Sequence, residues 1–202
     1  IVRLLEPDAG KIWVEGVEIT GLAKPALFEL RKRFGMLFQG AALFDSMTIC
    51  ENVSLGLKEH SDLSPAAIRD RACECLELVG LRGVEDKAPS ELSGGMKKRA
   101  GLARAIAMRP ATILYDEPTT GLDPITADAI NDLILKLQAE LKVTSIVVTH
   151  DLASAFKIGD RIAMLSRGKI IYADTVANAR RTEHPAVRQF IEGSAQGPLG
   201  VF

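Results

Sequence analysis

The sequence has 202 residues, of which 47% are hydrophobic, and its 25 basic and 26 acidic residues give a formal net charge of −1. This composition allows a sizeable core, and the near-neutral charge gives no reason to expect nucleic acid or an anionic membrane surface as a partner. No apolar run approaches the roughly 20 residues that span a bilayer, so any role at a membrane is expected to come through a partner. The 3 cysteines are an odd, sparse set, which favours a reducing compartment over a disulfide framework.

The first stretch, "IVRLLEPDAG" (residues 1–10), is an apolar run closed by Pro7 and Gly10. This pattern predicts the last turns of a helix. Because a chain rarely starts with the buried end of a helix, we expect the sequence to be a fragment whose beginning is missing.

The remaining elements are predicted from hydrophobic periodicity and turn residues. Strands are expected in residues 11–20 (a pair bending at Gly16), 34–39, 111–118, 144–151 and 160–174 (a hairpin turning at Arg167–Gly168), and helices in residues 25–33, 51–60, 64–80, about 94–109, 124–142 and 152–159. Continuous apolar runs at 111–118 and 144–151 predict strands that are buried on both faces.

Strand–helix–strand alternation in the second half predicts parallel βαβ units. The mainly helical sequence between Gln39 and the strand at 111–118 predicts an insertion. We therefore expect an α/β fold whose core is formed by residues 1–40 and 110–175, with an α-helical subdomain at about 41–109 and a C-terminal helix and tail at 176–202. In that last helix Val187, Phe190 and Ile191 form an apolar stripe, which would dock on a partner or pack on its own domain.

Polar residues end three of the predicted strands: Gln39, the pair Asp116–Glu117, and His150. Each has an ordinary explanation alone, as a turn or cap residue, but adjacent carboxylates at a sheet edge repel unless a cation is present. Ligands of open parallel sheets bind beyond the carboxyl ends of the strands. Together these residues suit Mg²⁺ and an activated water, with Asp116 beside the metal and Glu117 as general base. His150 is placed to hold a transferring phosphate, and Gln39 to reach the metal or the water.

The stretch "ELSGGMKKRAGLARAIAMRP" (residues 91–110) begins a helix with unusually flexible backbone. Ser93 is a good N-cap, and Gly94 and Gly95 let backbone N–H groups approach a ligand closely. The helix adds partial positive charge at its first turn, so the stretch predicts a phosphate site. The alternative is an ordinary capped helix with a solvated face formed by Lys97, Lys98 and Arg99.

The order of these motifs resembles the nucleotide-binding domain of an ABC transporter over essentially the whole chain. The matching segments are "LSGGM" (92–96), "ILYDEP" (113–118), "TGLDP" (120–124) and "VTHD" (148–151), preceded by the glutamine in "MLFQGAALFDSMTICENV" (36–53). The resemblance implies a P-loop NTPase-like core with these functional residues: Ser93, Gly94 and Gly95 as the signature loop, Asp116 and Glu117 as the Walker B acids, Gln39 in the Q-loop, Asp123 in the D-loop, and His150 as the switch histidine.

The same resemblance implies ATP and Mg²⁺ as cofactors and a head-to-tail dimer with a second copy of the subunit. In this family two domains sandwich two ATP molecules, so that the signature loop of one subunit covers the nucleotide held by the other. The motif glutamate then polarises the attacking water, and hydrolysis reopens the dimer.

Softer features resemble the phospholipid-transport branch of the family, the Mla/Mce or toluene-tolerance type. They are Met96, "KKRAGLARAIA" (97–107), "LFDSMT" (43–48) and "HPAVRQFIEGSAQGPLG" (184–200). This resemblance implies an integral-membrane permease and an MCE-domain protein as partners. It also implies a cytoplasmic position on the inner face of a bacterial inner membrane, and movement of phospholipid between membranes.

The main departure from the family pattern is that no G-x-x-x-x-G-K-[ST] run occurs in the 202 residues. We expect this Walker A loop and the N-terminal strands to lie upstream, so that the parent hydrolyses ATP and the fragment alone does not. Two alternatives stay open. One is a soluble ABC ATPase acting on ribosomes or DNA, although such proteins usually carry two cassettes or a coiled-coil insertion. The other is a regulatory pseudo-ATPase that lacks the P-loop.

Overall fold

The computed structural model describes residues 1–200. Its strands are β1 (Trp13–Val14), β2 (Val17–Glu18), β3 (Phe34–Leu37), β4 (Thr112–Asp116), β5 (Thr144–Val148), β6 (Arg161–Ser166) and β7 (Lys169–Thr175). Its helices are α1 (Lys24–Arg31), α2 (Ile49–His60), α3 (Pro65–Leu78), the 3₁₀ helix η1 (Pro89–Glu91), α4 (Gly94–Ile106), α5 (Pro124–Leu141), α6 (Leu152–Ile158), α7 (Val176–Arg181) and α8 (Pro185–Glu192). The strands and helices predicted after residue 10 are present, with ends that shift by a few residues.

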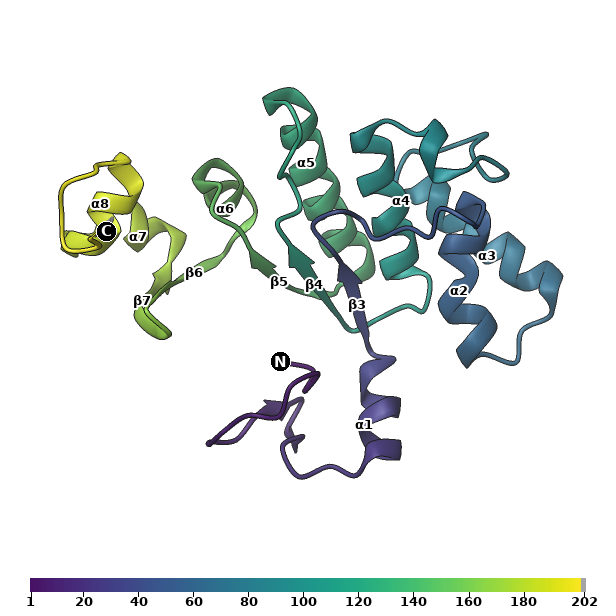
Figure 1. The fold of residues 1–202 in the computed structure, drawn as a ribbon, viewed down its shortest axis with the longest axis horizontal. Coiled ribbons are helices and arrows are strands. Elements are labelled where there is room, and N and C mark those ends of the chain that lie inside the picture. Colours follow the sequence, from purple (N-terminus) through teal and green to yellow (C-terminus); the bar gives the residue numbers. More distant parts are fainter. Residues whose placement is uncertain (201–202) are drawn as a thin grey trace.

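A parallel sheet in the order β3–β4–β5 lies at the centre of the molecule (Figure 1). Leu37 of β3 pairs with Tyr115 of β4, and Asp116 at the end of β4 pairs with Val148 at the end of β5. The prediction of parallel strands is therefore confirmed. Because all strands of the sheet run in the same direction, their carboxyl ends meet at one edge.

One face of this sheet is buried against α4 and α5. Leu37, Ile113 and Tyr115 are at most 1% exposed, and they belong to one apolar cluster with Leu102 of α4 and Ile134 of α5. Full burial of an aliphatic side chain of this size stabilises a fold by about 1.5–3 kcal/mol. This shared core fixes the strands that carry the predicted site residues against the two helices.

The other face of the sheet is more open, and here the sequence prediction for β5 is wrong. Ile146 is 38% and Val148 62% exposed, although the apolar run at 144–151 predicts a strand buried on both faces. Exposure alternates along β5, because α4 and α5 pack on the opposite face and residues 1–200 leave these two side chains largely uncovered.

The helices α2, α3 and α4 pack against one another beside β3 (Figure 1). Helix α2 begins with a capping box in which the Thr48 hydroxyl accepts a hydrogen bond from the Glu51 N–H (3.2 Å) and the Glu51 carboxylate accepts one from the Thr48 N–H (2.9 Å). Ser64 caps the N-terminus of α3, and its hydroxyl accepts a hydrogen bond from the Ala67 N–H. The apolar faces of these helices join the core of the sheet in one continuous cluster.

The first ten residues are not helical, which contradicts the sequence prediction. Arg3 has a left-handed φ of 54°, and its guanidinium donates to the carbonyl oxygens of Ile19 and Leu22. Leu4 and Leu5 are 71% and 87% exposed. The hydrogen bonds from Arg3 to the loop after β2 hold this segment in a non-helical conformation.

The C-terminal part consists of the β6–β7 hairpin followed by α7 and α8 (Figure 1). As predicted, the hairpin turns at Arg167 and Gly168, which both have positive φ. Helix α8 buries Val187 and leaves Phe190 42% exposed, so its apolar stripe packs partly on its own domain. Across residues 1–200, no helix has the length and apolar character needed to cross a membrane.

Candidate functional site

The polar residues predicted from strand ends lie at the carboxyl edge of the central sheet. Asp116 is the last residue of β4 and Glu117 follows it, while His150 comes two residues after β5. Gln39 comes two residues after β3 and is exposed. The parallel topology thus brings these residues, which are far apart in the sequence, to one side of the sheet.

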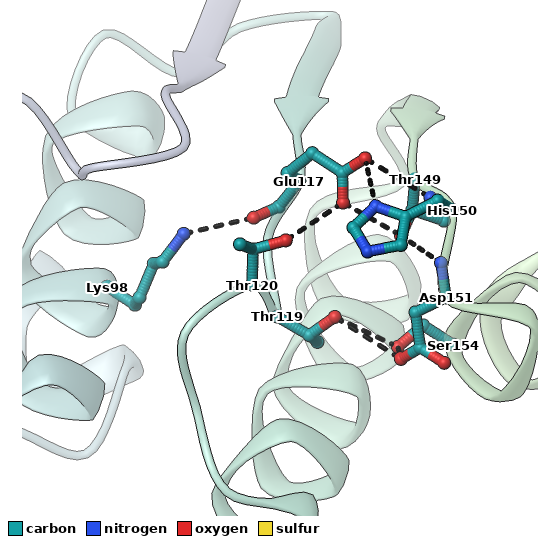
Figure 2. Close-up of polar contacts among 8 residues, drawn as sticks. All are labelled: Lys98, Glu117, Thr119, Thr120, Thr149, His150, Asp151 and Ser154. Atoms are coloured by element: carbon teal, nitrogen blue, oxygen red, sulfur yellow. Dashed lines mark hydrogen bonds and ion pairs between the residues drawn. The ribbon is translucent and has the colours of Figure 1, made fainter.

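Glu117 and His150 are in direct contact (Figure 2). The Nδ1 atom of His150 lies 2.8 Å from Oε1 of Glu117, and the backbone N–H of His150 donates to the same oxygen at 3.2 Å. The second carboxylate oxygen accepts hydrogen bonds from the hydroxyls of Thr120 (3.0 Å) and Thr149 (3.3 Å). The two threonines were not identified from the sequence, although both lie within the quoted motifs.

The contact shifts the protonation of both partners. Partial burial by itself raises the pKa of Glu117, but hydrogen bonds from His150 and Thr120 outweigh it and hold this pKa below its usual value. The hydrogen bond to the Glu117 carboxylate, together with its charge, raises the pKa of His150. Glu117 is therefore ionised at neutral pH, as a group that accepts a proton must be.

The backbone of Glu117 is strained and firmly held. Its φ of 46° is left-handed, a conformation that costs a residue with a Cβ on the order of 1–3 kcal/mol. Its N–H donates to the Val148 carbonyl at 2.9 Å, and its own carbonyl oxygen accepts a hydrogen bond from Nζ of Lys98 at 3.0 Å. This peptide conformation turns the side chain away from the strand direction and toward His150.

Asp116 is half-buried beside Glu117, and no residue of the described chain hydrogen-bonds to its carboxylate. Its oxygens are therefore free to bind a hard cation such as Mg²⁺, which prefers oxygen ligands. Residues 1–200 contain no group of three or more His, Cys, Asp or Glu side chains that could hold a metal, so the role of Asp116 as a magnesium ligand stays a prediction.

A buried polar network joins the loop after Glu117 to the loop after His150. Ser154 donates to Oδ2 of Asp151 at 2.5 Å, and Thr119 donates to the same oxygen at 3.4 Å (Figure 2). The Asn131 side chain in α5 donates to the Ser154 hydroxyl at 2.8 Å. Because Thr119, Asn131 and Ser154 are at most 5% exposed, these bonds are shielded from water and hold the two loops at a fixed separation.

The predicted phosphate loop lies at the N-terminus of α4, next to the N-terminus of α5. The Ser93 hydroxyl caps α4 by accepting from the Met96 N–H, and Asp123 caps α5 by accepting from two backbone N–H groups at 3.0 Å. A Cβ at Gly95 would lie 2.8 Å from the methyl carbon of Thr126, so glycine at this position also allows the two helix ends to approach each other. Ser93, Gly94 and Asp123 are exposed at this surface.

Lys98 is a site residue that the sequence did not identify. The sequence left open an ordinary capped helix with Lys98 on its solvated face. Lys98 is only 5% exposed, so that alternative is wrong for this residue. Its Nζ donates to the backbone carbonyls of Gln39 and Glu117. Burial lowers the pKa of the Lys98 ammonium, against the attraction of Asp116 and Glu117. Its burial could have been inferred from spacing, because Lys98 lies three and four residues before Gly101 and Leu102 and so shares their buried face of α4.

Arg99 is also not part of a solvated helix face, since its guanidinium donates to the Val79 carbonyl at 2.8 Å and the residue is half-buried.

The loop after Gln39 is held by hydrogen bonds from α4. Ala41 and Ala42 have left-handed φ values of 61° and 48°, and the Arg104 guanidinium donates to both carbonyls. Two consecutive alanines in this conformation persist because these hydrogen bonds fix them.

Comparison with known proteins places this geometry among nucleotide-binding cassettes. The sequence profile of a family described as "ABC transporter" matches residues 1–120. The chain is 40% identical over 201 residues to the "Probable ribonucleotide transport ATP-binding protein mkl" of Mycobacterium leprae, and it spans 58% of the length of that protein. It is 42% identical over 195 residues to the "Intermembrane phospholipid transport system ATP-binding protein MlaF" of Escherichia coli strain K12, of which it covers 72%.

Solved structures have the same fold. The ATP-binding cassette MJ0796, in a dimeric post-hydrolysis state bound to ADP and Pi, superimposes with a TM-score of 0.78 at 34% sequence identity, over 87% of this chain and 77% of that chain. The cbiO1 protein of Clostridium perfringens, part of the transporter complex cbiONQ, superimposes with a TM-score of 0.81 at 28% identity, over 96% of this chain and 75% of that chain. The predicted P-loop NTPase-like α/β fold is confirmed by these similarities.

Proposed function

The chain belongs to the ABC transporter family, and from that membership we propose that it is part of a subunit whose ATP hydrolysis powers phospholipid transport. The observation that carries the proposal is the contact between Glu117 and His150 beside Asp116, at the carboxyl edge of a parallel sheet. Glu117 is an ionised carboxylate held by the His150 imidazole, and the Asp116 carboxylate beside it is free to bind a cation. This arrangement suits the activation of water for attack on a phosphate.

Each residue of this edge has a role in the proposed reaction. Glu117 accepts a proton from the attacking water, and His150 holds Glu117 in place and faces the transferring phosphate. Asp116 and Gln39 would hold Mg²⁺, which supplies positive charge for the phosphates of ATP. Strain at Glu117 and its hydrogen bonds fix the direction of the carboxylate before substrate arrives.

Ser93, Gly94, Gly95 and Asp123 act across a dimer interface in this proposal. They lie at adjacent N-termini of α4 and α5, where backbone N–H groups and the helix dipole favour an anion. A second copy in head-to-tail arrangement would present its nucleotide to this surface. The dimeric state of the similar cassette MJ0796 supports the arrangement.

We place the permease at a groove lined by α1, β3, α2 and α4. Helices α2 and α4 form part of the proposed helical subdomain at about 41–109. The groove has a volume of about 610 Å³. It is lined by Phe28, Phe38 and Phe44, which are 56%, 41% and 50% exposed. Exposed aromatic side chains gathered around a groove are typical of protein–protein contacts. An MCE-domain protein and a position on the inner face of a bacterial inner membrane complete the proposed assembly.

The 202 residues contain no G-x-x-x-x-G-K-[ST] run. The backbone amides and the lysine of such a loop cradle the phosphates. We therefore propose that a polypeptide of these residues alone shows no saturable ATP turnover, and that turnover belongs to the complete polypeptide, meaning the product of the whole reading frame that contains them.

The cargo is tested by reconstituting the complete polypeptide with its permease in phospholipid vesicles. ATP-dependent movement of a fluorescent phospholipid is the expected result. The name of the Mycobacterium leprae relative makes ribonucleotides the second candidate, so a radiolabelled ribonucleotide is measured in parallel. ATP-dependent uptake of the ribonucleotide with no phospholipid movement would reject the lipid proposal.

A further inference from the structure

Lys98 connects two loops that leave neighbouring strands of the central sheet. It lies on α4, and its Nζ donates to the Gln39 carbonyl after β3 and to the Glu117 carbonyl after β4. We propose that Lys98 is a positioning residue that fixes the Gln39 loop and Glu117 relative to each other, so that a movement of one is transmitted to the other. This inference rests on the proposed ATPase function of the same site.

The Glu117 peptide shows why one hydrogen bond here affects the carboxylate. Its N–H is fixed to Val148 of β5, and its side chain is fixed to the loop after β5 through His150. The bond from Lys98 to its carbonyl is the connection toward α4 and β3 (Figure 2). The same carbonyl also accepts a hydrogen bond from the Thr120 N–H at 3.3 Å, but that bond stays within the loop after β4. Loss of the Lys98 bond therefore removes the link from Glu117 to α4 and the Gln39 loop, and the carboxylate then shifts with β5 rather than with the Gln39 loop.

The setting of Lys98 favours a role beyond packing. The side chain is 5% exposed, and an ammonium group is costly to bury unless its hydrogen bonds and nearby charges compensate. Here it places one positive charge close to the adjacent carboxylates of Asp116 and Glu117, whose mutual repulsion calls for a cation. An apolar residue would fill the same space without linking the two loops.

Arg104 offers an internal comparison on the same helix. Its guanidinium donates to the carbonyls of Ala41 and Ala42, so it also holds the Gln39 loop, but it makes no hydrogen bond to Glu117 in the described chain. Lys97 is a second comparison, since it comes directly before Lys98 in α4 and makes no side-chain hydrogen bond within residues 1–200. Substitution of Arg104 therefore tests the loss of a contact to the Gln39 loop alone, and substitution of Lys98 tests the loss of the link between the two loops. Substitution of Lys97 tests the loss of a positive charge without either contact.

The experiment compares Lys98→Met, Lys98→Arg, Arg104→Met and Lys97→Met in the complete polypeptide. Steady-state ATP hydrolysis gives kcat and KM, and hydrogen–deuterium exchange of the nucleotide-free protein reports on residues 38–42 and 116–120. Lys98→Met is expected to lower kcat by about 10²-fold, the scale of a small misplacement of a reacting group, with KM near the wild-type value. It is also expected to speed exchange in both segments.

The other variants complete the pattern. Lys98→Arg, which keeps the donors and the charge, restores most of kcat and slows exchange again. Arg104→Met speeds exchange in residues 38–42 only, and Lys97→Met changes neither measurement. If Lys98→Met does not fold, Lys98→Gln replaces it, because the shorter amide reaches at most one of the two carbonyls.

Two results would overturn the proposal: a wild-type kcat in Lys98→Met, or faster exchange in only one of the two segments. Failure of the ATPase proposal is recognised separately, since the wild-type protein would then show no ATP turnover. In that event the exchange measurement alone decides whether Lys98 couples the two loops.

Discussion

The imidazole of His150 and the carboxylate of Glu117 form a contact of 2.8 Å in which the histidine is much the more exposed partner. The His150 side chain is 74% exposed and the Glu117 side chain 17%. The ring therefore covers one side of a carboxylate that is otherwise bounded by Thr120 and Thr149. Because the pair lies at the solvent boundary of the site, the charge of His150 responds to pH.

This pair predicts a pH dependence that can be read from the histidine ring. The raised pKa of His150 means that its contribution to stability is complete below the usual value of 6.5 and is lost as pH rises through the folded value. The lowered pKa of Glu117 means that its contribution is complete above 4.5 and is lost as pH falls through the folded value. The contact should therefore stabilise the protein most between these two limits.

The measurement is a titration of the ring resonances by ¹H–¹⁵N NMR in nucleotide-free protein, with His150→Ala used to assign the signal. We expect a midpoint for His150 above 6.5 that falls in Glu117→Gln, because the neutral amide removes the stabilising charge. An unchanged midpoint in Glu117→Gln would show that the two side chains do not interact in solution.

Much of the fold could be predicted from local patterns. Residues 112–116 and 144–148 are rich in apolar and β-branched residues, which favours strands. Residues 124–141 are helical because their apolar positions recur at helical spacing after an N-cap at Asp123. The gathering of Asp116, Glu117 and His150 follows from strand order, since parallel strands end at one edge.

Other features depend on contacts that local patterns do not encode. Lys98 is buried because two carbonyls from distant loops meet its ammonium group, and a single lysine in a helical sequence gives little sign of them. The exposure of Ile146 and Val148 depends on which elements cover the sheet, not on strand composition. The conformation of residues 1–10 depends on the hydrogen bonds of Arg3 to Ile19 and Leu22.

Gly35 is predicted to be essential for the approach of β3 to α4. A Cβ at this position would overlap the backbone carbonyl oxygen of Ala105 and lie 3.2 Å from Cγ of Pro110. Because a backbone atom cannot move aside as a flexible side chain can, Gly35→Ala should lower the free energy of unfolding by about 1–3 kcal/mol. Denaturant titration measures this change.

Gly21→Ala is the matched control for Gly35→Ala. A Cβ at Gly21 would have no neighbouring heavy atom within 4 Å, so this variant should keep the wild-type midpoint. Equal stability of the two variants would mean that β3 and α4 are not packed as closely as described.

The cysteines are predicted to differ in reactivity. Burial raises the pKa of Cys75 to about 11 from 9.0. Burial also raises the pKa of Cys73, but that side chain is only half-buried and its shift is smaller. Since the thiolate is the reactive form, the shift of Cys75 should slow its alkylation at pH 8 by about 100-fold relative to an unshifted thiol. Mass spectrometry after timed iodoacetamide treatment should find Cys73 modified before Cys75, with the difference removed in denaturant. Preferential labelling of Cys75 in the native protein would contradict its burial in α3.

The central claim, that Glu117 activates water for ATP hydrolysis, is tested most directly by the turnover of the complete polypeptide and its Glu117→Gln variant. The wild-type protein should hydrolyse ATP with saturable, Mg²⁺-dependent kinetics. Loss of the general base should lower kcat by about 10²–10⁴-fold. ATP should still bind and hold the variant as a dimer, which light scattering detects. Wild-type turnover in Glu117→Gln would contradict the role assigned to this residue.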